Sequence, residues 1–104
     1  MDRITQLNAF LEKTPNDSFV QHALALEYIK KGDDATAKML FETLLSGNED
    51  YVGSYYHLAK LLERTGARDE AIAVYEKGMA KTKALNETHA YNELLAAYDD
   101  FMDY

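Results

Sequence analysis

Two stretches of the sequence share one pattern: GDDATAKMLFE at residues 32–42 and GARDEAIAVYE at residues 66–76. Each begins with a glycine, has an alanine five positions later, and has an aromatic residue four positions after that alanine. A gapless shift of 34 residues extends the match toward the N-terminus, where Leu24 falls on Leu58 and Ala25 falls on Ala59. A fixed period in the range of about 20 to 50 residues indicates stacked structural repeats.

Within each copy, the apolar residues recur at the spacing of one helix face, first before the glycine and again after it. Gly32 and Gly66 can adopt the left-handed conformation that ends a helix. Asp33 or Asp34 can then cap the next helix, and Asp69 and Glu70 bring the same charge to the second copy. Each unit is therefore predicted to be a helix, a tight turn and an antiparallel helix. The core residues expected from this pattern are Leu24, Ala25, Tyr28, Ala37, Phe41 and Leu44 in the first copy, and Tyr55, Leu58, Ala59, Leu62, Ala71 and Tyr75 in the second.

Four alanines have a predicted packing role, because they are small residues on otherwise bulky apolar faces: Ala25, Ala37, Ala59 and Ala71. A methyl group at such a position lets two helices cross closely, and the neighbouring large side chains fill the space beside the crossing.

These residues resemble the tetratricopeptide repeat (TPR) family, whose pattern has an aromatic, leucine with a small residue, tyrosine, glycine, alanine and an aromatic at this period. The resemblance covers residues 18–84. The sequence departs from the family pattern at five positions: Gln21 replaces the first aromatic residue, Leu44 and Gly78 replace a late alanine, and Glu49 and Lys83 replace the closing proline.

The resemblance implies an all-α fold, a right-handed superhelix of antiparallel helix pairs with about six helices, in a single domain over residues 1–104. We expect an N-terminal half-repeat at 2–15, repeats at 18–51 and 52–85, and a C-terminal capping helix with a short acidic tail at 86–104. The N-terminal helix is expected to turn Ile4, Leu7, Phe10 and Leu11 inward, and Tyr91, Leu94, Leu95 and Tyr98 repeat the spacing of a first helix. Such caps are needed because a middle repeat exposes apolar surface on both sides.

Composition excludes several kinds of protein. The net charge of −7 disfavours binding to nucleic acid phosphates or to an anionic membrane surface. The absence of cysteine excludes disulfides, thiolate metal sites and cysteine nucleophiles. The N-terminal residues contain no uninterrupted apolar core of a signal peptide, and no apolar run approaches the length of a membrane span. We therefore expect a soluble, cytoplasmic protein.

The first helices of the repeats line the concave side of such a stack. By resemblance to TPR proteins, the groove positions of the family include Ala23, Gly53 and Glu63, in addition to the candidate residues named at the end of this paragraph. Some TPR domains hold a C-terminal carboxylate with lysine and asparagine, but His22, Leu26 and His57 stand at those positions, so this function is not carried over. The candidate partner-binding residues are Phe19, His22, Leu26, Ile29, Lys30, Tyr56, His57, Lys60 and Arg64.

The function predicted by the resemblance is a non-catalytic interaction module that binds a peptide or helix of a partner protein. No cofactor, metal or catalytic residue is predicted, since the sequence has no glycine-rich phosphate loop, nucleophile elbow or closely spaced histidine pair. The protein is expected to be a monomer or a weak homodimer. The alternative is a structural role through self-association of the terminal helices, with Phe101, Met102 and Tyr104 in a symmetric dimer.

Overall fold

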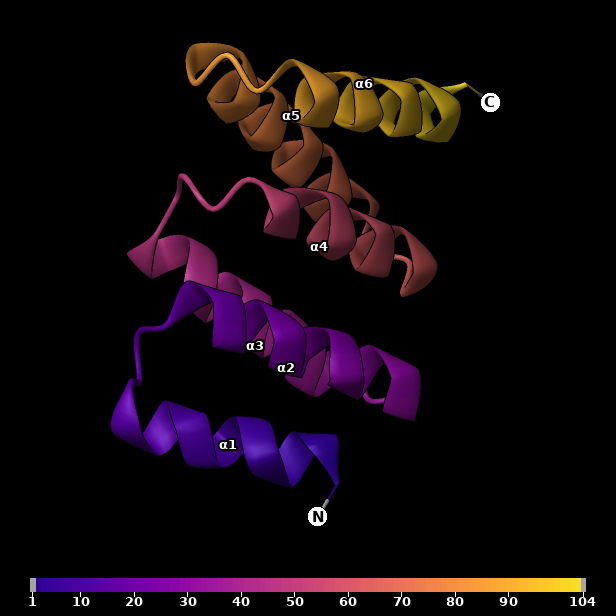
Figure 1. The fold of residues 1–104 in the computed structure, drawn as a ribbon. Helices are drawn as coiled ribbons and strands as arrows, with labels where there is room; N and C mark the ends of the chain where they lie inside the picture. The colour runs from indigo at the N-terminus through magenta and orange to yellow at the C-terminus, as the bar shows by residue number, and fades with distance from the viewer. Residues whose placement is uncertain (1, 104) are drawn as a thin grey trace. The chain divides into compact units, whose positions relative to one another are not determined.

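The computed structural model describes residues 2–103, and that range contains six α-helices and no β-strand (Figure 1). The all-α class and the number of helices predicted from the sequence are confirmed. Tyr104, which the sequence analysis assigned to a dimer contact, lies outside the described residues. The helices are α1 (Arg3–Lys13), α2 (Ser18–Lys31), α3 (Asp34–Gly47), α4 (Gly53–Arg64), α5 (Arg68–Ala84) and α6 (Thr88–Met102).

The chain divides into two compact units, Met1–Glu49 with α1 to α3 and Asp50–Tyr104 with α4 to α6. In the first unit, α2 packs against both α1 and α3. In the second, α5 packs against α4 and α6, and α4 also contacts α6. The expected repeats 18–51 and 52–85 enclose α2–α3 and α4–α5, and we keep these limits and the single domain as proposed divisions.

Both glycine turns have the predicted left-handed conformation, with φ of 86° at Gly32 and 82° at Gly66. After Gly32, the amide of Asp33 donates to the carbonyl of Tyr28 at 2.9 Å, which satisfies a carbonyl at the end of α2. The Asp33 carboxylate then accepts hydrogen bonds from the Thr36 hydroxyl at 2.7 Å and the Thr36 amide at 3.1 Å. These bonds lower the pKa of Asp33, and they identify it as the cap of α3.

The second copy begins its second helix differently. Ala67 stands at the cap position of α5 and makes no side-chain hydrogen bond, whereas Asp69 and Glu70 lie in the first turn of the helix. Their charge is favourable beside the positive end of the helix dipole. The start of the second helix is therefore stabilised by a capping side chain in the first unit and by first-turn charges in the second.

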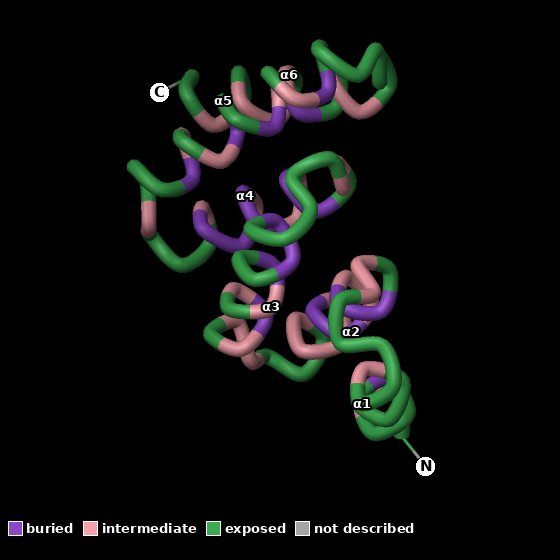
Figure 2. Tube along the Cα trace, turned by 90° about the vertical axis from the view of Figure 1, so that its left-hand side faces the viewer, coloured by how far each residue is buried: buried purple, intermediate pink, exposed green. Residues whose placement is uncertain are grey.

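The four predicted alanines are fully buried, each with 0% of its surface exposed: Ala25, Ala37, Ala59 and Ala71. The aromatic residues that follow two of them, Phe41 and Tyr75, are also fully buried. Figure 2 shows the buried positions recurring along α2 to α5 on the sides that meet neighbouring helices. The small-residue packing inferred from the repeat is confirmed by this burial.

We expect Ala37→Leu or Ala71→Leu to lower the free energy of unfolding by about 1–3 kcal/mol, because neither site has room for three extra carbon atoms. Urea unfolding followed by circular dichroism would measure the change. Ala35→Leu and Ala73→Leu are matched controls, since these alanines are exposed on the same two helices. Equal stability of the buried and the exposed variants would contradict the packing account.

One core prediction is wrong: Phe10 does not face inward but is 60% exposed. Within its unit α1 packs mainly against α2, and this contact covers one stripe of the helix. Leu7 lies in that stripe and joins a cluster with Val20 and Leu24, while Ile4 and Leu11 pack partly against it. At the other end of the chain, Leu94 is buried, and Tyr91, Leu95 and Tyr98 are only half-buried.

Across residues 2–103, none of the helices combines the length and the apolar character that a membrane crossing requires.

Candidate functional site

One face of α4 carries polar and aromatic side chains that the core does not use. Six residues of this helix are buried, which leaves a single stripe at intervals of three or four residues. Gly53 and Glu63 belong to the stripe, as their family positions implied. The remaining members are Tyr56, His57, Lys60 and Arg64, which we call the α4 face.

The rings of Tyr56 and His57 support each other on the α4 face. Their centroids are 5.5 Å apart and their planes are nearly perpendicular, at 86°. This edge-to-face arrangement is the favourable one for two rings. Both side chains are half-buried, so the pair presents a partly apolar surface formed by two nearly perpendicular rings.

Lys60 is positioned by a link to the core of the second unit. Its Nζ lies 3.3 Å from Oε1 of Glu63, and the Tyr75 hydroxyl donates a hydrogen bond to the other oxygen of Glu63. Burial and the bond to this carboxylate raise the pKa of Tyr75, so the hydroxyl keeps its proton and remains the donor. The ammonium group of Lys60 therefore has a fixed neighbour while part of its side chain stays exposed.

Burial lowers the pKa of His57, and the carboxylate of Glu93 on α6 partly opposes this effect. The imidazole is therefore mainly neutral at pH 7 and can both donate and accept a hydrogen bond.

A lowered pKa in the folded state means that the unfolded chain binds the proton of His57 more readily. Stability from this group is therefore present above the ordinary pKa of 6.5 and is lost as pH falls from there through the folded value. We expect thermal unfolding of the wild type to move to lower temperature as pH is lowered from about 7.5 to about 5.5. His57→Gln should flatten this dependence, and identical pH profiles for the two proteins would contradict the assignment.

In the first unit, the five remaining candidate residues lie along one stripe of α2: Phe19, His22, Leu26, Ile29 and Lys30, which we call the α2 face.

The apolar residues of the α2 face differ in exposure. Phe19 is 68% exposed, so α1 does not cover it, while Leu26 and Ile29 are half-buried. The His22 ring meets the buried ring of Phe41 edge-on at 5.6 Å. Ala23, at a groove position of the family by resemblance, is half-buried and packs partly against the cluster of Leu7, Val20 and Leu24.

The basic end of the α2 face is Lys30, whose Nζ lies 3.1 Å from Oε2 of Glu27. The side chain of Lys30 is mostly exposed, and such a surface pair has little effect on stability. Lys30 therefore remains accessible to an acidic group of a partner.

A polar pocket of about 290 Å³ in the first unit escaped the sequence analysis. It is lined in part by Gln21 and Leu44, two of the three positions where the first repeat departs from the family pattern. The Gln21 amide donates to the carbonyl of Pro15 at 3.1 Å, and the Asn48 amide donates to the Ser18 hydroxyl at 3.0 Å. These bonds satisfy the polar side chains of Gln21 and Asn48 within the first unit. The one feature of the sequence that could have indicated the pocket was the presence of Gln21 where the family pattern has an aromatic residue.

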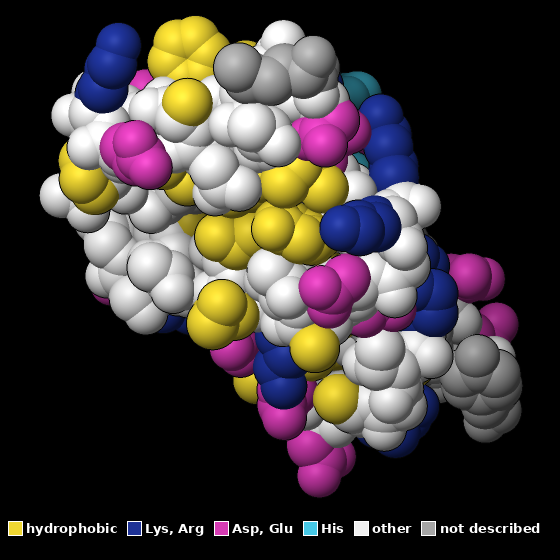
Figure 3. All heavy atoms as spheres, turned by 90° about the horizontal axis from the view of Figure 1, so that it is seen from below, with side chains coloured by type: hydrophobic (Ala, Val, Ile, Leu, Met, Phe, Trp, Pro, Cys, Tyr) yellow, Lys and Arg dark blue, Asp and Glu magenta, His cyan; other side chains and the backbone are white. Residues whose placement is uncertain are grey.

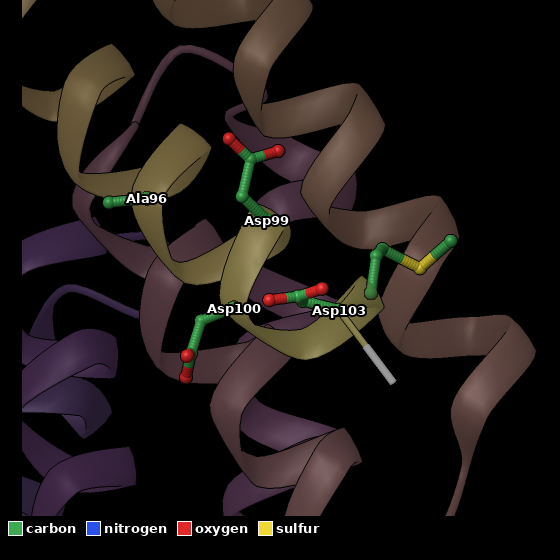
Figure 4. A pocket seen from close by; sticks show the side chains of 5 residues that line it. Ala96, Asp99, Asp100 and Asp103 are labelled. Atoms are coloured by element: carbon green, nitrogen blue, oxygen red, sulfur yellow. The ribbon is translucent and has the colours of Figure 1, made fainter.

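Among residues 2–103, the histidine and acidic side chains form no group of three placed to hold a metal ion. An open pocket of about 570 Å³ beside α6 is lined by three acids, Asp99, Asp100 and Asp103. Figure 4 shows the carboxylates of Asp99 and Asp100 pointing away from each other. Their arrangement therefore offers no common point for a cation.

Comparison with known proteins gives consistent matches. The family model described as tetratricopeptide repeat matches residues 52–80. A solution structure of a tetratricopeptide repeat domain protein from Salinibacter ruber is similar, with 37% identity, a TM-score of 0.82, and coverage of 86% of this chain and 90% of that one. A crystal structure of a tetratricopeptide repeat domain protein from Salinibacter ruber has 38% identity, a TM-score of 0.77, and coverage of 82% and 96%. No curated protein sequence matches the chain.

Proposed function

The chain belongs to the tetratricopeptide repeat family, and we propose that it binds short segments of partner proteins through the α4 face of the second unit and, separately, through the α2 face of the first unit. Tetratricopeptide repeats generally mediate protein–protein interaction, and the family is generally non-catalytic. The observation that carries the proposal is the edge-to-face pair of Tyr56 and His57 on α4, beside a lysine that Glu63 positions.

The chemistry of the two faces favours a partner segment with both apolar and acidic side chains. Tyr56 and Phe19 offer aromatic surface, and aromatic residues dominate the energetics of protein interfaces. Lys30, Lys60 and Arg64 offer cations in a protein whose net charge is −7. Basic side chains on an otherwise acidic surface attract a carboxylate locally, while the overall charge repels a nucleic acid. The partner we propose is therefore a protein or peptide.

The alternative, in which the terminal helices make a symmetric dimer, would leave both faces free for such a partner. Phe101 is already engaged inside the second unit, where its ring lies 6.2 Å from Tyr75 and 4.9 Å from the Arg68 guanidinium. This use of Phe101 reduces its value for a dimer contact.

The proposal is tested by affinity capture from a lysate of the source organism with the wild type and a triple variant, His22→Ala, Tyr56→Ala and Lys60→Ala. We expect the amount of captured partner protein to fall at least tenfold in the variant, because aromatic and charged interface residues each contribute about 1 kcal/mol or more to binding. Circular dichroism checks that the helices remain.

The matched control is Met39→Ala, Glu42→Ala and Lys77→Ala, which removes an apolar, an acidic and a basic side chain from exposed positions of α3 and α5. It should retain the bound protein as the wild type does. Equal retention by the face variant and by the control would refute binding through these faces.

A further inference from the structure

The two terminal helices each correspond to one half of a repeat. A shift of 34 residues places Leu7 of α1 on Phe41 of α3, and it places Phe10 on Leu44. Helix α1 is thus equivalent to the second helix of a repeat, and no helix precedes it within the described residues 2–103.

At the other end, a shift of 36 residues aligns α6 with α4, the first helix of a repeat. Tyr91 then falls on Tyr55, Leu95 on Ala59 and Tyr98 on Leu62. No helix follows α6 within the described residues 2–103. One end of the chain therefore has a second helix, and the other end has a first helix.

Burial shows what each terminal helix lacks. Leu44 is 1% exposed in its complete pair, whereas the equivalent Phe10 is 60% exposed. Phe10, Gln6, Ala9 and Lys13 line a shallow pocket of about 370 Å³ along one stripe of α1. This surface is the α1 face.

The corresponding surface of α6 is the stripe of Tyr91, Leu95, Tyr98 and Met102, which we call the α6 face; within it, the Tyr98 ring also packs edge-on against Tyr75 of α5. In α4, the equivalents of the first three residues are at most 1% exposed. In α6, the first three are half-buried, and Met102 is 39% exposed. Figure 3, a view from below, shows hydrophobic side chains at the surface between acidic and basic ones. The α1 and α6 faces differ in that, among residues 2–103, neither is covered by the helix that covers its equivalent in a complete repeat.

We propose that the α6 face of one copy of this chain packs antiparallel on the α1 face of a second copy, which completes a helix pair between the two molecules. The complete pair in the second unit shows the register: position 78 of α5 faces Tyr55 of α4. Transferred by the two shifts, Phe10 of one copy faces Tyr91 of the other. Both are ring side chains, so α1 and α6 need a wider spacing at this pair than α4 and α5 have at Gly78, with the two rings offset.

Charge complementarity supports this register. In the second unit, Nζ of Lys81 lies 3.4 Å from Oδ1 of Asp50, close to the start of α4. The residue equivalent to Lys81 in α1 is Lys13; the shift of 36 places Asp50 on the uncharged Asn86, and the acidic residue next to it is Glu87 at the start of α6. Antiparallel packing therefore brings Lys13 of one copy near Glu87 of the other.

The opposite end of the contact has the same pairing of signs. Arg3 begins α1, and its guanidinium makes only a long 4.0 Å contact with Glu27 and is more than half exposed. Asp99 and Asp103 lie at the end of α6, where Arg3 of the second copy would approach. Basic residues at both ends of α1 thus meet acidic residues at both ends of α6.

This contact joins two different faces, so it differs from a symmetric dimer, which would pair a face with itself. Each molecule keeps one free α1 face and one free α6 face after the first contact forms. The average mass of the complexes is therefore expected to rise with concentration, unless two copies each place their α6 face on the α1 face of the other and form a closed dimer. It does not depend on the α4 face or the α2 face.

Sedimentation velocity at concentrations up to about 1 mM would detect even a weak contact. The wild type should show species larger than a monomer, with a weight-average mass that rises with concentration. Phe10→Asp blocks the α1 face, and Leu95→Asp blocks the α6 face. Each variant alone should stay monomeric.

The decisive sample is a mixture of the two variants. It contains one intact α1 face and one intact α6 face, so it should form a 1:1 complex that grows no further. If Leu95→Asp loses its helical circular dichroism signal, Met102→Asp blocks the same face from an exposed position. A wild type that is monomeric throughout, an Asp variant that still self-associates, or a mixture that remains monomeric would each overturn the proposal.

Discussion

Gly78→Ala is expected to lower the free energy of unfolding by about 3 kcal/mol, at the upper end of the range for an overpacked core. A Cβ atom built at Gly78 would lie 2.7 Å from Cβ and 2.9 Å from Cγ of Tyr55, and 3.0 Å from Cδ1 of Leu94. The Cβ of Tyr55 cannot move without its backbone, so α4 and α5 would have to separate. The loss should exceed the gain of about 1 kcal/mol that alanine normally brings to a helix interior. Urea unfolding would measure it.

Gly47→Ala is the matched control, because this glycine also lies in a helix and nothing stands within 4 Å of its added Cβ. The control should be neutral or slightly stabilising. Loss of stability in Gly47→Ala equal to that in Gly78→Ala would mean that glycine itself, rather than the contact with Tyr55, is what matters.

The first repeat suggests a second substitution that should compensate for a larger side chain at position 78. It has Gln21 and Leu44 at the positions where the second repeat has Tyr55 and Gly78. Gly78→Leu alone should be more damaging than Gly78→Ala, and Tyr55→Gln added to Gly78→Leu should recover part of the loss. A purely additive double-mutant cycle would show that the two positions are not coupled.

Tyr75→Ala is expected to lower the free energy of unfolding by about 3–5 kcal/mol, since the ring is fully buried. Tyr75 lies edge-on to Tyr98 at 5.9 Å and near Phe101 at 6.2 Å, so its removal empties the contact between α5 and α6. Thermal and urea unfolding would report this loss.

Tyr75→Phe separates the ring from the hydroxyl. It keeps the aromatic packing and removes only the hydrogen bond to Glu63, which should cost about 1–2 kcal/mol. A cost for Tyr75→Phe as large as that for Tyr75→Ala would mean that the bond to Glu63, rather than burial of the ring, stabilises the second unit.

Local pattern was sufficient to predict most of the fold. The glycine turns, the four buried alanines and the six helices depend on residues close in sequence or one period apart, and a fixed period makes each copy evidence for the other. The sequence predicted an aspartate cap after Gly32 but left Asp33 and Asp34 both open, and the hydrogen bonds with Thr36 identify Asp33.

The errors concern surroundings rather than pattern. Phe10 has the spacing of a core residue, but α1 packs on α2 through the stripe of Leu7, and Phe10 stays 60% exposed. The tight contact at Gly78 required knowledge of how closely α4 and α5 approach, which periodicity does not give.

The candidate site could be predicted as a stripe but not as a set of contacts. The same spacing that places Tyr55 in the core places Tyr56 on the outer face of α4. The link from Lys60 through Glu63 to Tyr75 joins α4 to a residue 12 positions beyond Glu63, on α5, and no local pattern reveals it. The lowered pKa of His57 likewise depends on its burial in the folded unit.

The central claim is that the α4 face binds a partner protein, and site-specific crosslinking tests it most directly. A photoreactive phenylalanine derivative would replace Tyr56 in one sample and the exposed Ala73 of α5 in another. After illumination in a lysate of the source organism, we predict a defined crosslinked protein from position 56 and none of the same mass from position 73. The same adduct from both positions, or no adduct from position 56, would contradict the claim.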